Sequence, residues 1–188
     1  MGSNLMKTYF KQSMQRLCFP TTIITTSSYA DMIPKDFHGL TVSSMTSLSV
    51  NPSPLLQFNV QIPSLSSKNL HLHDIFAVHQ LKPEFSSVEL VRRFSKGIKH
   101  GGTEPFVELK ETIDFSIYRN AIYDSDKSVL PILKNVERVL ICKKKESFPV
   151  ADHEVWVGEV IDCIVNDNTI TGGLLHSNGE FYMMGEKI

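Results

Sequence analysis

Cysteine is scarce in this chain of 188 residues, and its three copies, Cys18, Cys142 and Cys163, lie far apart. No Cys-x-x-Cys pair occurs, which excludes a zinc ribbon and a thioredoxin-like redox motif. A low and odd count is typical of proteins from a reducing compartment. Cys142 and Cys163 fall within strand-like patterns, so we expect both to be buried, unreactive thiols.

Long apolar runs are also missing. No stretch approaches the roughly 18 residues that span a bilayer, so we expect no membrane partner. The N-terminus lacks the apolar region of a secretory signal, which predicts an intracellular protein, cytoplasmic or mitochondrial and not secreted. The opening Met1-Gly2-Ser3 also matches a remnant of an expression vector, so it leaves open whether a targeting peptide once preceded it.

The chain has no excess of charge of one sign. Lys and Arg number 19 and Asp and Glu number 20, which gives a net charge of -1. Proteins that bind nucleic acid usually carry a basic excess, so we expect no nucleic-acid partner. Apolar residues make up 41% of the chain, enough for a folded core. The length suits a single domain spanning residues 1–188.

A regular alternation of strands and helices is absent, and neither GxGxxG nor a P-loop occurs, which argues against a Rossmann fold. Many short strands separated by turns predict a mainly β protein, a barrel or a sandwich, with short flanking helices. Asn178-Gly179 between two apolar runs predicts a hairpin. We expect strands at 21–26, 39–44, 55–60, 74–79, 137–142 and 154–165, helices at 4–17, 64–73 and about 83–94, one helical turn at 128–133, and a solvated turn at Lys143–Lys145.

Hydroxyl residues are abundant and unevenly placed. The chain has 20 Ser and 11 Thr, and 16 of these lie between Thr21 and Ser67. Small hydroxyl residues let a flat ligand approach the backbone and donate neutral hydrogen bonds to it, as the segment Gly39–Ser49 can. Ser64, Ser66, Ser67, Lys68 and Asn69 offer phosphate-binding groups at the start of a helix. The alternative is an ordinary Ser/Thr-rich strand edge followed by a helix cap.

The order of these segments resembles the flavin reductase-like domain family, the FMN-binding split β-barrels. The similarity covers most of the chain, but residues 83–136 match poorly and form an excursion. The matching pieces are Phe19–Thr26, the Gly-Leu-Thr-x-Ser-Ser-x-Thr-Ser-x-Ser segment Gly39–Ser49, Asn51-Pro52, the strand at 55–60, Ser66-Ser67, Phe76–His79, a strand ending in Cys142, Asp152-His153-x4-Gly158-Glu159-Val160, and Leu174–Tyr182.

The resemblance implies a homodimer of Greek-key split barrels that binds FMN, or FAD in some members. It places the flavin ring against one set of residues and the flavin phosphate against a second set. His153 corresponds to a histidine near the nicotinamide site, and Ala151 stands where the family often has glycine. The ring set is Thr41, Ser43, Ser44, Met45 and Thr46, and the phosphate set is Ser67, Lys68 and Asn69.

The resemblance further implies an NAD(P)H-dependent flavin reductase, which passes reduced flavin or electrons to an accepting protein. His153 would orient the nicotinamide carboxamide or supply a proton, and its alternative is a solvated histidine at a strand start. A second hypothesis is a non-catalytic flavin-barrel module for interaction or assembly, with the excursion docking a partner. A third is a barrel like pyridoxamine-phosphate oxidase that uses FMN.

A metal site is the weaker interpretation of His71 and His73. Their spacing puts both rings on one face of a strand, but no clear third ligand accompanies them. We therefore expect no bound metal and a solvated surface at these two histidines.

Overall fold

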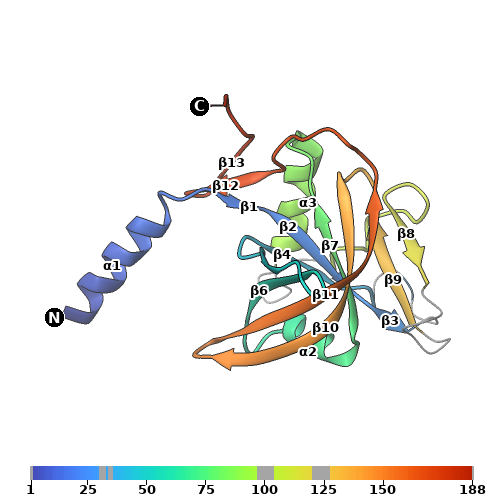
Figure 1. Ribbon diagram of the computed structural model, residues 1–188, viewed down its shortest axis with the longest axis horizontal. Helices are drawn as coiled ribbons and strands as arrows, with labels where there is room; N and C mark the ends of the chain where they lie inside the picture. The colour runs from blue at the N-terminus through green and yellow to red at the C-terminus, as the bar shows by residue number, and fades with distance from the viewer. Residues whose placement is uncertain (1, 30–32, 34–35, 97–103, 120–127, 188) are drawn as a thin grey trace.

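The computed structural model describes residues 2–29, 33, 36–96, 104–119 and 128–187 (Figure 1). These residues fold mainly as β-strands with three helices, which confirms the predicted fold class. The helices are α1 (Gly2–Met14), α2 (Leu65–Leu72) and α3 (Phe85–Ser95). The strands are β1 (Phe19–Pro20), β2 (Thr22–Thr26), β3 (Ser28–Tyr29), β4 (Gly39–Val42), β5 (Thr46–Ser49), β6 (Leu55–Gln61), β7 (Ile75–Gln80), β8 (Phe115–Tyr118), β9 (Ser128–Leu133), β10 (Arg138–Val150), β11 (His153–Val165), β12 (Leu175–Ser177) and β13 (Glu180–Tyr182).

The central feature is a seven-stranded antiparallel sheet in the order β4-β2-β7-β10-β11-β6-β5. Strands β4 and β5 are its two edges, yet only Ser43–Met45 joins them in the chain. A connection this short forces the sheet to curl until its edges come close. Within the described residues, no strand pairing closes the two edges into a barrel. The link therefore lies at the seam of a curled sheet.

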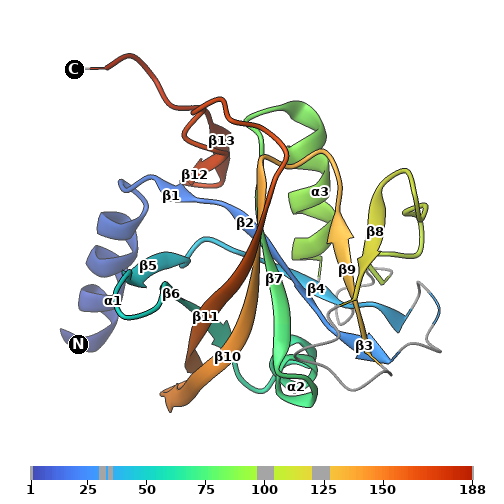
Figure 2. The same ribbon diagram turned by 45° about the vertical axis from the view of Figure 1, so that its right-hand side comes forward.

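Two hydrophobic clusters occupy the two faces of this sheet. Because successive residues of a strand face opposite sides, Ile23 packs in one cluster and Ile24 in the other. The inner cluster joins residues from both ends of the strand order, and its aromatic centre is Phe58, Phe76 and Trp156. The outer cluster lies between the sheet and the layer formed by α3, β8 and β9 (Figure 2).

The excursion at 83–136 is a part of the outer core. Its described residues include α3, β8 and β9, and its buried side chains Phe94, Phe106 and Phe115 pack edge to face. The helical turn expected at 128–133 is wrong, because this segment is strand β9 and pairs with β8 and β3. The Leu/Ile pattern around Pro131 does not reveal these long-range partners.

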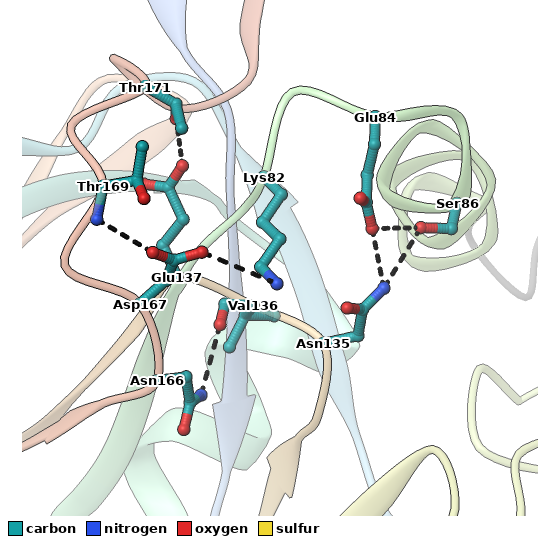
Figure 3. A network of polar contacts seen from close by, with 10 residues as sticks. All are labelled: Lys82, Glu84, Ser86, Asn135, Val136, Glu137, Asn166, Asp167, Thr169 and Thr171. Atoms are coloured by element: carbon teal, nitrogen blue, oxygen red, sulfur yellow. Dashed lines mark hydrogen bonds and ion pairs between the residues drawn. The ribbon is translucent and has the colours of Figure 1, made fainter.

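Polar contacts tie the two ends of the excursion together (Figure 3). Glu84, before α3, accepts a hydrogen bond from Asn135 Nδ2 at 2.6 Å and one from Ser86 Oγ at 2.6 Å. The neighbouring buried Glu137 accepts a hydrogen bond from the Thr171 hydroxyl, which fixes the segment that follows β11. These hydrogen bonds hold the two ends of the excursion next to each other and to the segment after β11.

Two further expectations are corrected by the long β10–β11 hairpin. Lys143–Lys145 lies within β10 and is not a solvated turn, because β10 continues well past the apolar run that ends at Cys142. Cys142 is buried, and burial raises the pKa of its thiol. Cys163 is exposed, in the part of β11 beyond Glu159 where β6 no longer pairs with it.

Candidate functional site

The link between β4 and β5 carries most of the residues that the sequence assigns to a flavin ring. Ser44 Oγ accepts a hydrogen bond from the backbone N–H of Asn59 on β6 at 2.9 Å. This contact holds the link against the strand next to the β5 edge. Thr41 lies at the other side, where its hydroxyl donates to the Val91 carbonyl of α3 at 3.1 Å. The Thr41 donor is therefore engaged in packing α3.

Ser43 and Ser44 of the link, and Thr46 at the start of β5, keep hydroxyl protons that no described residue accepts. Ser43 is half-buried, and its hydroxyl has no partner among the described residues. Ser44 uses a lone pair toward Asn59, which leaves its proton free to donate. Thr46 is exposed and accepts from Gln57 Nε2 at 3.3 Å, and Met45 packs against the inner cluster. Neutral hydrogen-bond donors where the two edges of the sheet approach each other suit a ligand ring with an uncharged polar edge.

Helix α2 carries the second candidate group. Ser64 caps it by accepting from the Ser67 backbone N–H at 3.1 Å. Ser67 is buried, whereas Lys68 is exposed and Asn69 half-buried. A helix N-terminus with an adjacent lysine is a favourable environment for phosphate.

His38 connects this helix to β4, and sequence reasoning missed it. Its Nε2 lies 3.0 Å from Ser66 Oγ on α2, and its backbone directly precedes Gly39 at the start of β4. Burial lowers the pKa of His38 to about 4, so the ring is neutral at physiological pH. Its Nδ1 is buried without a hydrogen-bond partner among the described residues. Its place directly before the Gly39–Ser49 motif was the only signal in the sequence.

The two glycines of the motifs have a packing role. A Cβ atom on Gly39 would lie 2.8 Å from the Ile24 carbonyl oxygen and 2.6 Å from the Phe94 ring. A Cβ atom on Gly158 would lie 2.6 Å from the Phe76 ring. The Gly39–Ser49 and Asp152–Val160 motifs therefore contain residues that fix the curl of the sheet as well as candidate site residues.

His153 lies at the tip of the β10–β11 hairpin, where β11 begins. Its exposed ring places Nδ1 2.9 Å from Asp152 Oδ1. This hydrogen bond, together with the nearby imidazole, holds the pKa of the Asp152 carboxyl below its usual value. Because a carboxylate only accepts, Nδ1 carries the proton and Nε2 faces away from Asp152. Ala151 at the turn has a left-handed φ of 54°.

A buried carboxylate follows His153, and no sequence pattern indicates its burial. Glu154 accepts hydrogen bonds from Trp156 Nε1 at 2.7 Å and from His71 Nε2 at 2.9 Å. Burial alone would raise the pKa of Glu154, but hydrogen bonds from His71, Trp156 and Ser67 outweigh it and hold the pKa below its usual value. His71 thus contacts a carboxylate, and no three His, Cys, Asp or Glu side chains of the described residues could hold a metal ion.

The candidate groups are spaced along two strands. His38 and Ser66 mark one end of β4 and Ser43 the other, and the five residue steps from His38 to Ser43 span about 17 Å at roughly 3.3 Å per residue. His153 pairs with Gln61 on β6, two positions beyond the Asn59 that Ser44 contacts, or about 7 Å. The register of β6 thus places His153 within a few residues of the link, and α2 lies beside His38 at the start of β4 and beside Glu154, the residue after His153.

These residues fit a flavin. The link offers neutral donors of the kind that the polar edge of a flavin ring accepts, and α2 offers a lysine and a helix N-terminus for a phosphate. The two groups are separated along β4, as the ring and the phosphate of a flavin nucleotide are along its ribityl chain. The buried Nδ1 of His38 has no hydrogen-bond partner among the described residues, so the polar groups beside this strand are not all satisfied within that part of the chain.

The chain belongs to the flavin reductase like domain family, whose model matches residues 14–185. Its sequence is similar to the reductase component of the FADH2-dependent resorcinol hydroxylase of Rhizobium sp. (strain MTP-10005). The two are 23% identical over 177 residues, which cover 92% of this chain and 84% of that protein.

Solved structures share the fold. A flavin reductase domain protein from Arthrobacter sp. FB24 superposes with a TM-score of 0.72 at 24% identity, covering 97% of this chain and 98% of that one. The NADH:FAD oxidoreductase SgcE6 of Streptomyces globisporus C-1027, in complex with NAD and FAD fragments, gives 0.73 at 18% identity, covering 98% and 96%. None of the described helices is long and apolar enough to cross a membrane.

Proposed function

We propose that the protein is an NAD(P)H-dependent flavin reductase that uses FMN, with FAD as the alternative flavin. The observation that carries this proposal is the placement of Ser43 and α2 at the two ends of β4, with His153 beside the link. Family membership supports it. The names of the relatives speak of FADH2 and of bound FAD fragments, so FAD belongs in every assay.

The chain's residues have separable tasks in this proposal. A flavin bound there would supply the redox chemistry, a two-electron reduction by the reduced nicotinamide. Ser43 and Ser44 donate neutral hydrogen bonds to the polar edge of the ring. Lys68 and Asn69 bind the phosphate, and Ser67 supports them from within α2.

His153 has the geometry to serve the nicotinamide. With Nδ1–H donated to Asp152, the neutral ring presents a lone pair on Nε2, which can accept from a carboxamide N–H. In its protonated form the same nitrogen donates a proton instead. Asp152 thus fixes which nitrogen faces the substrate.

We further propose that the protein is a homodimer and serves an electron-accepting protein. Helix α1 stands apart from the rest of the described structure (Figure 1). One side of α1 exposes the apolar residues Leu5, Met6, Tyr9 and Phe10. An unpartnered apolar face of this kind is covered when two copies associate. The resorcinol hydroxylase relative is named as a reductase component, which supports an accepting partner.

The test is direct. The purified protein is titrated with FMN and with FAD, and NADH and NADPH oxidation is followed with each flavin. We expect flavin binding and flavin-dependent nicotinamide oxidation, which the His153→Ala variant slows while flavin binding stays intact. Flavin binding without oxidation would support the non-catalytic module instead, and absence of both would refute the proposal.

A further inference from the structure

Glu154 is the centre of a buried polar cluster that the reaction itself does not use. Its side chain is only 8% exposed and accepts hydrogen bonds from Trp156 Nε1 at 2.7 Å and from His71 Nε2 at 2.9 Å. The hydroxyl of Ser67 donates to the same carboxylate. A buried carboxylate with three donors is well compensated, because each donor replaces part of its lost hydration.

Lys144 extends the cluster from β10. Its Nζ lies 3.0 Å from His71 Nδ1 and 4.7 Å from the centre of the Trp156 ring. Because an ammonium group only donates, Nδ1 of His71 accepts, and the ring proton therefore sits on Nε2 and points at Glu154. The hydrogen bonds thus run in one direction, from Lys144 through His71 to the carboxylate.

The cluster holds one face of α2. Ser67 and His71 are four residues apart, so they lie one turn from each other on the same side of the helix. Both contact the same carboxylate, which fixes the first and the last turn of α2 against β11. The helix has only eight residues, and such a short helix is marginal without tertiary contacts.

The adjacent residues Ser67 and Lys68 therefore have different surroundings. Ser67 is buried and its hydroxyl faces Glu154, so the carboxylate competes with a phosphate for its proton. Lys68 is exposed, and the side chain of Asn69 is half-buried. The orientation of these two residues depends on how α2 is held, and hence on Glu154.

We infer that Glu154 is a positioning residue, which sets α2 so that Lys68 and Asn69 can bind the flavin phosphate. This inference rests on the proposed flavin-binding function. It assigns Ser67 to the support of the helix and not to direct phosphate contact. His153 and Glu154 are consecutive residues of β11 and point to opposite sides of the strand. The first residue thus serves the proposed nicotinamide site, and the second serves the proposed phosphate site.

The experiment compares FMN with riboflavin, which has the same ring but no phosphate. Dissociation constants for both are measured on the full-length protein and on Glu154→Gln, Ser67→Ala, Lys68→Ala and, as a matched control, Glu159→Gln. Glu159 lies on the same strand, and its carboxylate is paired with Lys145 at the surface. Ser67→Ala removes a single hydroxyl and serves if Glu154→Gln does not fold.

We expect the unaltered protein to bind FMN at least tenfold more tightly than riboflavin. Lys68→Ala, Glu154→Gln and Ser67→Ala should each reduce that preference several-fold while riboflavin affinity stays unchanged, and Glu159→Gln should alter neither. Unchanged FMN preference in Glu154→Gln and Ser67→Ala would overturn the inference, as would a gain in FMN affinity, which would show the carboxylate acting as a repelling charge. If the unaltered protein binds neither flavin, the proposed function fails instead.

Discussion

The base of the 83–136 excursion and the link between β4 and β5 differ in how their polar groups are paired. In the network of Figure 3, Glu84, Asn135 and Glu137 are joined to partners from α3 and from the segment after β11. In the link between β4 and β5, the Ser43 hydroxyl lacks a partner among the described residues and the Ser44 proton remains available. Polar groups paired with one another hold the fold, whereas hydroxyls that the fold does not use are available to a ligand.

We expect the largest loss of stability from a substitution at a buried polar side chain that the fold uses for its own hydrogen bonds. His79 is fully buried, with Nδ1 donating to the Ile23 carbonyl at 3.0 Å and Nε2 accepting from the Leu133 N–H at 3.0 Å. His79→Ala leaves both groups unpaired and opens a cavity, so we expect a loss of about 3–5 kcal/mol in unfolding free energy. Urea denaturation measures this loss.

The contrasting variant is His153→Ala at the exposed hairpin tip. It should change the unfolding free energy by less than about 0.5 kcal/mol, because no buried group depends on it. An equal loss of unfolding free energy in His79→Ala and His153→Ala would contradict this distinction between a buried structural histidine and an exposed one.

The second prediction concerns pH. Burial lowers the pKa of both His79 and His38 from 6.5 to about 4, although the backbone contact with Ile23 partly opposes this at His79. Below pH 6.5 the unfolded chain therefore binds protons at these two histidines that the folded chain does not bind. The free energy of unfolding has its full value above pH 6.5 and falls as the pH drops toward 4. We expect a loss of about 2 kcal/mol per histidine between roughly pH 7 and pH 5.

Denaturation curves across this range test the sign. A His79→Gln variant that still folds should show a shallower pH dependence than the unaltered protein. Stability that rises on acidification would contradict the burial of these two neutral rings.

A third prediction addresses the link. Ser43→Ala removes a donor that the fold does not use, so flavin affinity should fall about tenfold, equivalent to roughly 1.4 kcal/mol, with little change in stability. Thr41→Ala is the matched control, because its hydroxyl donates to Val91 and its loss should affect stability more than binding. Fluorescence titration and thermal melting of both variants distinguish the two roles, and the reverse pattern would show that the link is structural.

The smallest effect concerns the hairpin tip. Ala151 has a φ of 54°, a region where a Cβ atom is unfavourable. Ala151→Gly should therefore stabilise the protein by up to about 1 kcal/mol, with part of the gain offset by the freer unfolded chain. A lower melting temperature for Ala151→Gly would show that Ala151 makes contacts that outweigh its strain.

The sequence predicts the fold wherever local patterns decide it. The β-branched run in β2, the Asn178-Gly179 hairpin and the apolar spacing of α3 each carry their own signal, and the structure contains all three elements. Strand β5 was missed and β9 was assigned to a helical turn. Strand β5 pairs with β6, the next strand along the chain, whereas β9 pairs with β3 and β8, and neither β5 nor β9 shows a regular alternation of apolar and polar residues.

The candidate site was predictable only in part. The Gly39–Ser49 motif located the link, but no local pattern distinguishes Ser43, whose hydroxyl has no partner among the described residues, from Thr41, whose hydroxyl packs α3. His38 and Glu154 were missed because their importance comes from burial and from partners on other elements. Individual roles therefore required the three-dimensional arrangement.

The central claim is that the free donors of the link and the first turn of α2 bind the two ends of a flavin. One measurement tests it most directly: titration of the purified protein with FMN, FAD and riboflavin, followed by NADH or NADPH oxidation with each bound flavin. The account predicts tight binding of a phosphorylated flavin, weaker binding of riboflavin, and flavin-dependent oxidation of the nicotinamide. Equal or absent binding of all three compounds, with no oxidation, would contradict it.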